Sequence, residues 1–342
     1  MSILNWLSRS DTARTRERRA SVRATQAVEI AVIGIDARLR LVNDYASRLL
    51  PAVEKALVHC SALAAAIPGP IDLLPEAWSR DSSLRALFVQ PAEIEELLGR
   101  SLELLAFAEQ PVHASVEQLL AVISTVRTEQ KALGWAKQGE VLQRDVPQRT
   151  VSFSRHRLLA PSASEAELRC EIEWRAYEHL VVEALGCLLQ SGTAERPGGR
   201  TGALLRERLQ LLQQARAGPV AWQQPPLADE AAFQSLRQQL IENGRQLASL
   251  QQHASGLEER LERVIEVLAK PADFIAFGRI EDRLTSLNVV AGDADEVAAD
   301  LSLAEIAVMG AQTYARSTAI VRLSRRQLKP RRMDFSAAER WL

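Results

Sequence analysis

The sequence has few of the residues from which most disulfide and metal sites are built. It contains 3 cysteines and 5 histidines among 342 residues. Cys60, Cys170 and Cys187 are widely spaced and odd in number, so they predict neither a disulfide framework nor a zinc site. A reducing, cytoplasmic location fits this usage. Free cysteine behaves as a small hydrophobic residue, and we expect all three side chains to be buried.

Aromatic residues and long apolar runs are also scarce. Aromatics make up 5% of the chain, and no run of eighteen or more apolar residues occurs. The sequence therefore predicts no membrane-spanning helix, and Ile3–Leu7 is too short for the apolar part of a secretory signal. Leucine, alanine, glutamine, glutamate and arginine dominate instead, and they favour helix over strand.

The usual catalytic motifs are missing, which argues against an enzyme. No nucleophile elbow and no zinc-protease motif occurs. The glycines of Gly198–Gly202 lack the lysine and spacing of a phosphate-binding loop and indicate a linker. His179 and Glu183 have the i,i+4 spacing of metal ligands, but a single such pair favours an ordinary surface pair. We therefore predict no catalytic activity, cofactor or metal.

One polar cluster in the middle of the chain is a candidate site. His156 lies between Arg155 and Arg157, and with Arg144 and Arg149 it forms a possible anion-binding patch. The alternative is a solvated hairpin face, because isolated charged turns are common on surfaces. An enzyme built around this cluster is the least favoured hypothesis, since no nucleophile or base has a placed partner.

Charge is unevenly distributed along the chain. The net charge is −1, but residues 1–25 carry +4 and residues 316–342 carry +6, which leaves −11 for the rest. Basic segments attract phosphates or anionic lipid, and they also dock onto acidic surfaces of the same chain. Both interpretations stay open. We expect residues 1–25 to form a flexible basic tail.

Residues 26–190 predict a helical, bundle-like domain. The apolar stripe from Tyr45 to Ile67 predicts a helix that contains Pro51 and stops at Pro68-Gly69-Pro70. Asp81 or Ser82 is a candidate N-cap, and Pro91 suits the first turn of the next helix. The helical spacing of six further apolar residues predicts another helix, with Val112, Val116, Leu119, Ile123, Val126 and Leu133 on one face.

The end of this domain carries the only predicted strands within it. Residues 139–159 are polar with interspersed valine and a turn at Pro147-Gln148, and predict one inserted β-hairpin. Ser162 with Glu165, and Ser164 with Glu167, are overlapping capping-box candidates that predict the start of a long helix reaching about Gln190. Residues 191–202 are the clearest linker.

Residues 203–268 are the most regular part of the sequence, and we expect helix and coiled coil. Five heptads have a nearly continuous apolar seam, which predicts a helix that packs along another helix. The seam residues are Phe233, Leu236, Leu240, Asn243, Leu247, Leu250, Ala254, Leu257, Leu261, Val264 and Leu268. The partner is either a second chain, which we favour, or the preceding helix at 203–215.

Residues 269–342 predict a small α+β module with a basic tail. Leu303–Tyr314 is interpreted as helix and Thr318–Leu323 as a strand, because of its β-branched content. Phosphate contact by the basic residues is the alternative functional hypothesis. These residues are Arg322, Arg325, Arg326, Lys329, Arg331 and Arg332.

Together these patterns predict a mainly α protein with one hairpin, a coiled coil and a small C-terminal module. The leading functional hypothesis is a non-catalytic cytoplasmic interaction or scaffold protein that self-associates through the heptad segment. The alternative is a nucleic-acid-binding accessory protein that uses its basic C-terminal tail.

Overall fold

The computed structural model describes residues 22–138, 141–190, 199–214, 230–250, 254–291, 298–309 and 313–328. The chain forms two compact units, each assembled from separate stretches of sequence. Unit 1 comprises residues 1–62, 172–275 and 309–311, and unit 2 comprises residues 63–171, 276–308 and 312–342. The predicted tail at 1–25 and linker at 191–202 lie largely outside the described residues.

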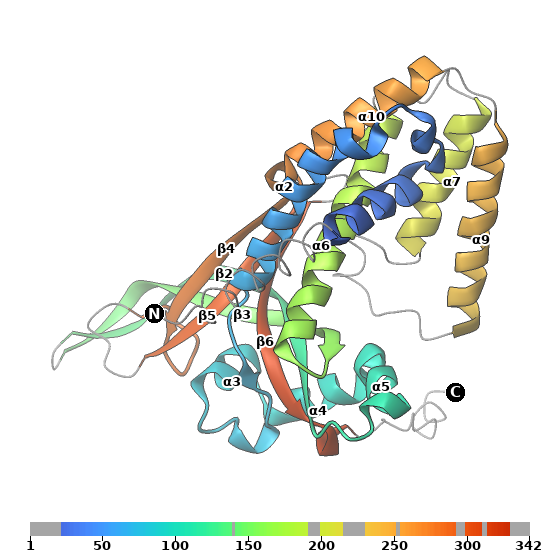
Figure 1. Ribbon diagram of the computed structural model, residues 1–342. Helices are drawn as coiled ribbons and strands as arrows, with labels where there is room; N and C mark the ends of the chain where they lie inside the picture. The colour runs from blue at the N-terminus through green and yellow to red at the C-terminus, as the bar shows by residue number, and fades with distance from the viewer. Residues whose placement is uncertain are drawn as a thin grey trace, which may run out of the picture. The chain divides into compact units, whose positions relative to one another are not determined.

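Unit 1 consists of helices around an apolar core (Figure 1). The first helix covers residues 22–35 and is followed by the short η1 (Ala37–Leu41). The others are α2 (Tyr45–Ala66), α6 (Glu165–Gln190), α7 (Arg200–Gln214), α9 (Glu230–Ser249) and α10 (Ala254–Ala269), of which α2 and α6 extend into unit 2. Fully buried side chains include Ile35, Leu49, Tyr177, Leu205 and Leu261.

Several predicted helix boundaries are confirmed. Helix α2 ends at Ala66, just before Pro68-Gly69-Pro70, and accommodates Pro51 in its interior. Ser164 accepts a hydrogen bond from the backbone N of Glu167 at 3.3 Å, and α6 runs from Glu165 to Gln190 as expected. Such capping satisfies the amide groups that a helix leaves open at its start.

Helix α2 is long and apolar enough to cross a membrane by length and composition. This is weak evidence for a span, because the core helix of a globular unit has the same properties. Leu49, Val53, Ala56 and Cys60 on α2 are buried in the protein.

The predicted continuous heptad helix is wrong in one respect, because the segment forms two helices. Helix α9 ends at Ser249 and α10 begins at Ala254. Helix α9 packs against α7, while α10 packs against η1. A polar seam position and two interior glycines weaken a single long rod.

Unit 2 contains a six-stranded sheet, so the prediction of a mainly α protein with one hairpin is wrong. Five strands have the order β3-β2-β6-β5-β4, and β1 pairs in parallel with β6. The strands are β1 (Ile71–Asp72), β2 (Gln118–Gln138), β3 (Val141–Ser162), β4 (Ile275–Leu284), β5 (Ala299–Val308) and β6 (Tyr314–Ser324). The described strand pairs among β2, β3, β5 and β6 are antiparallel.

Two predicted helices are strands. Residues Leu119 to Leu133 belong to β2, whose residues 119 and 121–125 are all buried. Burial of both sheet faces removes the alternation of apolar and polar residues that marks a half-buried strand. Leu303–Val308, predicted to be helical, lies in β5, whereas the predicted strand at Thr318–Leu323 is confirmed within β6.

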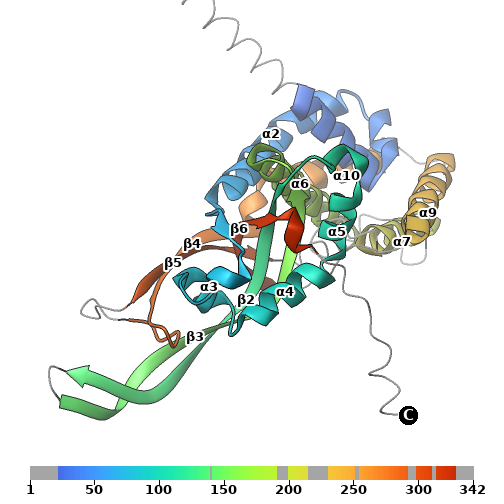
Figure 2. The same cartoon turned by 90° about the horizontal axis from the view of Figure 1, so that it is seen from below.

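The predicted hairpin at 139–159 is a small part of a much longer ribbon. Strands β2 and β3 pair from Leu120 and Ser162 to Gln138 and Val141, but β2 pairs with β6 only over Gln118–Thr125. Figure 2 shows the β2–β3 ribbon continuing beyond the rest of the sheet. A two-stranded ribbon is marginally stable alone, so its base in the sheet supports it.

Three β-bulges interrupt β3. The register with β2 shifts at Leu120/Val122, Ser124/Val126 and Gly134/Ala136. Each shift coincides with a residue of positive φ on β3: Ala160 at 52°, Arg155 at 53° and Asp145 at 58°. Bulges bend a strand and change the direction of its side chains, and they occur often next to functional sites.

The two edges of the sheet are connected through the turn after β4. Val290 bridges Leu284 at the end of β4, and Val289 bridges Thr150 on β3. Asp282 of β4 also forms a bidentate ion pair with Arg127 of β2, at 2.9 and 3.0 Å. These contacts cover part of the edges that an open sheet exposes.

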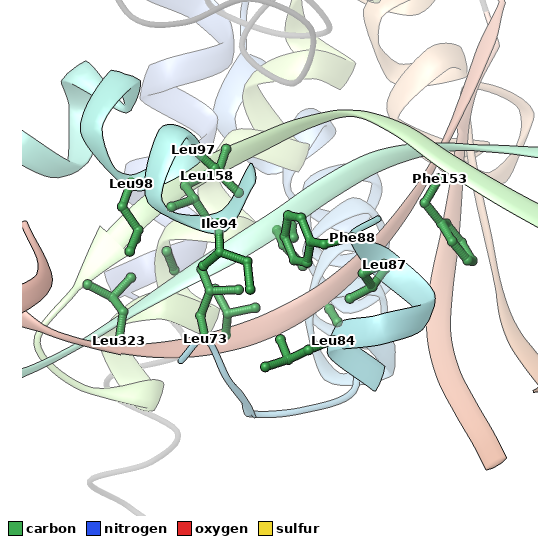
Figure 3. Packing of buried hydrophobic residues seen from close by; sticks show 14 of the residues in the cluster. Leu73, Leu84, Leu87, Phe88, Ile94, Leu97, Leu98, Phe153, Leu158 and Leu323 are labelled. Atoms are coloured by element: carbon green, nitrogen blue, oxygen red, sulfur yellow. The ribbon is translucent and has the colours of Figure 1, made fainter. Parts of the chain in front are cut away.

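The core of unit 2 lies between the sheet and three short helices. Asp81 caps α3 (Ser82–Leu87), and α4 (Pro91–Arg100) begins at Pro91, both as predicted. Helix α5 (Leu102–Glu109) follows. Figure 3 shows the leucines of α3 and α4 packed onto the strands. Phe88, Phe153, Leu158 and Leu323 belong to the same apolar cluster.

Candidate functional site

A buried arginine on β6 is the most unusual charged group in unit 2. Arg316 is 7% exposed. Its Nε donates to Ser124 Oγ at 3.0 Å, and one terminal nitrogen donates to the carbonyl of Arg155 at 3.3 Å. Both partners are neutral, and no described carboxylate forms an ion pair with Arg316. Buried charges normally have a partner of opposite sign.

The neighbours of Arg316 make its charge more costly. The pKa of Arg316 is lowered from 12.5 to about 10, first by burial, then by the nearby positive charge of Arg157 and to a smaller extent by that of Arg155. Only Tyr314 acts in the opposite direction. We call Arg155, Arg157 and Arg316 the arginine cluster. Arg155 and Arg157 thus lie close enough to Arg316 for their positive charges to act on its guanidinium.

A bulge in β3 separates the two arginines of that strand in the register with β2. Arg157 lies opposite Ser124 in the register, whereas Arg155 is the extra residue between this pair and the next pair, Val126 and Ser154. The backbone of Arg155 has φ of 53°, a conformation that is unfavourable for a bulky residue. Strain of this kind is found often at binding and catalytic sites.

His156 lies at the side of the cluster. Its ring stacks on Phe88 with centroids 4.6 Å apart, and burial lowers its pKa from 6.5 to about 4. The described residues offer no hydrogen-bond partner to Nε2. The imidazole is therefore neutral at physiological pH and contributes polarity but no charge.

The predicted patch is only partly assembled. The structure brings Arg155 and Arg157 together with His156, but the other two arginines lie farther along the ribbon. Arg149 pairs with Glu129 at 3.4 Å, and Arg144 is exposed beside the bulge at Asp145. The sequence did not indicate Arg316 or Ser124, because both reach the site through pairing between strands far apart in the chain.

The basic C-terminal residues have mainly internal roles where the structure describes them. Arg325 donates to the carbonyl of Ala108 in the last turn of α5 and to the carbonyl of His113 in the short η3 (Pro111–His113). Arg322 pairs with Asp72 at 3.5 Å, and Arg326 lies 3.9 Å from Glu117. Lys329, Arg331 and Arg332 lie outside the described residues.

The heptad seam is divided between two environments. Leu257, Leu261, Val264 and Leu268 of α10 are buried in unit 1. Leu247 of α9 is buried, while Leu236 and Leu240 of α9 and Leu250 just after it are half-buried. The structure does not describe the side chains of Phe233 and Ala254.

Asn243, the polar residue of the heptad seam, forms hydrogen bonds within the chain. Asn243 Nδ2 donates to the carbonyl of Leu204 at 2.9 Å and to Glu207 at 3.0 Å, and its carbonyl oxygen accepts from Arg208. Leu204, Glu207 and Arg208 all belong to α7. The helix at 200–214 is thus a partner of α9, which was one of the two alternatives.

The remaining candidates are the pair of His179 and Glu183 and the three cysteines. His179 and Glu183 are 3.9 Å apart on α6, and His179 is buried rather than on the surface. Among the cysteines, Cys60 is buried as expected, Cys187 is half-buried and Cys170 is exposed, so burial of all three was wrong. The described residues contain no group of three or more histidine, cysteine or acidic side chains placed to hold a metal.

Comparisons with protein families, with curated proteins and with solved structures found no match.

Proposed function

We propose that the protein is a binding protein that holds an anionic group against the arginine cluster. One observation carries this proposal: Arg316 is buried, hydrogen-bonded only to neutral groups and repelled by two further guanidinium groups. An anion placed among them would provide the missing charge. Burying a charge without a partner costs several kcal/mol, and a bound anion offsets this cost.

The residue types favour a carboxylate or a phosphate. Guanidinium is planar and donates two parallel hydrogen bonds to either group, which ammonium does not do. Arg157 is half-buried and Arg155 is exposed, so the cluster extends from solvent to the buried Arg316. The exposed Arg155 is thus the part of the cluster that a charged ligand in solvent can contact first.

Titration of the full chain with inorganic phosphate, pyrophosphate and acetate tests the proposal. Isothermal calorimetry should show saturable binding of at least one anion, and Arg316→Gln should weaken it at least tenfold. Arg149→Gln is the matched control, because it removes the same charge from an exposed site on β3, farther along the ribbon than Arg155 and Arg157. Equal affinity in both variants, or no binding of any anion, would overturn the proposal.

Self-association through α9 is a second proposal with an observation of its own. Ile241 is 48% exposed on α9, beside the half-buried seam residues Leu236 and Leu240. A helix that leaves apolar side chains open on one stripe is suited to pack on a second copy. Light scattering should show an oligomer that Ile241→Glu dissociates. A monomeric parent protein at tens of micromolar would end this proposal.

Nucleic-acid binding by the basic C-terminal residues has weaker support. Arg325 is engaged with backbone carbonyls and Arg322 with Asp72, so neither is available without giving up a contact. Binding to an oligonucleotide that falls steeply with salt, and that is lost on truncation after residue 328, would support it.

A further inference from the structure

The sheet face that carries the arginine cluster continues along the ribbon and has no charge there. From Val126 to Gly134 the register of β2 with β3 is regular. The two residues of each cross-strand pair therefore have their side chains on the same side of the ribbon, and successive pairs alternate between its two sides. Val151 and Phe153 belong to the hydrophobic core, which assigns Arg127 and Glu129 to the core side. The opposite side is uncharged and polar. Its polar residues are Thr128, Gln130, Gln148, Thr150, Ser152 and Ser154.

We call these six residues the neutral face. Four of them are exposed and two, Gln148 and Thr150, are half-buried, so the face is accessible. The core side of the same ribbon is charged, with Arg127, Glu129, Lys131 and Arg149. Between Val126 and Gly134, the ribbon thus has its four charged residues on one side. The neutral face therefore does not result from a lack of charged residues in the ribbon, because charged residues are present on its core side.

The neutral face leads directly to the arginine cluster. Ser124, which binds Arg316 and lies opposite Arg157, is on the same side of β2 as Val126 and Thr128, since alternate residues of a strand share a face. Ser154 lies next to the bulge that carries Arg155. From Val126 to Gly134 the strand covers roughly 25 Å. A ligand anchored at the arginines therefore has a long uncharged surface beside it.

On the basis of the proposed anion-binding function, we infer that the ligand is an acidic oligosaccharide, with one acidic group at the arginine cluster and a hydroxyl-rich body on the neutral face. Hydroxyl and carboxamide side chains both donate and accept hydrogen bonds, and sugar hydroxyls do the same. The charge pattern of the site matches a ligand that is charged at one end only.

Two other polymers fit the face less well. A nucleic acid carries a phosphate on every unit and needs cations along its whole path, which the neutral face lacks. An extended peptide binds a sheet by pairing with a free strand edge. The outer edge of β3 is interrupted by three bulges and is paired with residues 288–290 beside Thr150.

Three saccharide probes test the inference by calorimetry on the full chain: glucuronate, maltotriose, and maltobiose extended by a terminal glucuronate. We expect the acidic trisaccharide to bind at least tenfold more tightly than glucuronate, and maltotriose to bind very weakly. Thr128→Ala with Ser152→Ala should reduce the acidic trisaccharide to the affinity of glucuronate and leave glucuronate binding unchanged. Arg316→Gln should weaken both acidic probes.

The control and the contrary outcomes separate this inference from the proposed function. Lys131→Gln alters the other side of the ribbon and should leave trisaccharide binding unchanged. If glucuronate or phosphate binds but the sugar chain adds no affinity, the saccharide inference fails and anion binding stands. Tighter binding of a hexapeptide whose only charge is a free C-terminal carboxylate, or of an oligonucleotide, also overturns it. If no anion binds, the proposed function itself fails.

Discussion

Arg316 and Ser124 join the two central strands of the sheet by a 3.0 Å hydrogen bond from Nε to Oγ. The hydroxyl satisfies one donor of the guanidinium but does not neutralise its charge. Because Arg157 and Arg155 both lower the pKa of Arg316, the cationic form is held in an unfavourable place. Under the proposed function, Arg316 serves ligand binding rather than stability.

Replacing Arg316 should therefore separate binding from stability. Arg316→Gln keeps a hydrogen-bonding side chain and removes the charge, so we expect the ligand-free protein to unfold at an equal or higher temperature. A gain of about 1 kcal/mol corresponds to roughly 2–4 °C in Tm. Calorimetric melting checks this, and a fall of more than a few degrees would show that Arg316 has a structural role.

Loss of Asp282 should have the opposite effect. Its carboxylate is buried and forms a bidentate pair with Arg127, across strands that lie apart in the sheet order. Asp282→Ala leaves the guanidinium without this partner and should lower the free energy of unfolding by about 3 kcal/mol. Urea unfolding measures the loss. The double variant Arg127→Met, Asp282→Leu should recover much of it, and failure to recover would contradict the ion-pair explanation.

Arg325 should contribute to stability through the end of α5. Its guanidinium donates to the carbonyl of Ala108, which the end of α5 leaves without an intrahelical partner, and to the carbonyl of His113, which also accepts from the backbone N of Val116. We expect Arg325→Gln to cost about 1–2 kcal/mol in urea unfolding. Arg326→Gln is the control, since that side chain is 88% exposed and should change stability little. Equal effects of the two substitutions would remove the capping role.

The same arrangement explains why basic residues were difficult to interpret from the sequence. Arg169 donates to the carbonyls of Ala64 and Ile67 near the end of α2, and Arg208 donates to those of Ile33 and Gly34 at the end of the first helix. Each arginine comes from a distant part of the chain. The number of basic residues in a segment can be read from the sequence, but the distant backbone carbonyls to which their side chains donate cannot.

Local signals predicted helix boundaries better than they predicted the sheet. Asp81, Pro91 and Ser164 act through neighbouring residues, so their roles are visible in the sequence. Strand β2 was mistaken for a helix because its base is buried on both faces and lacks alternation. The candidate site was harder to predict than the strands, because it depends on the order of the strands in the sheet. Arg316 comes close to Arg155 and Arg157 only because β2 pairs with both β3 and β6.

The pH dependence of stability should reveal the His179–Glu183 pair of unit 1. Burial raises the pKa of Glu183 from 4.5 to about 7 and lowers that of His179 from 6.5 to about 4. Glu183 then contributes stability that is fully present below pH 4.5 and is lost as the pH rises to 7. His179 contributes stability above pH 6.5 that is lost as the pH falls towards 4.

Glu183→Gln should remove the first of these effects and keep the second. The variant has no carboxylate to ionise inside the protein, so at pH 8 it should be roughly 2–3 kcal/mol more stable than the parent chain. The difference should shrink as the pH is lowered from 7 to 5, while both proteins keep the acid-side decline that His179 causes. Urea unfolding at closely spaced pH values from 4 to 8 measures both curves. Parallel curves over this range would mean that Glu183 ionises at its ordinary pKa and that burial does not hold its proton.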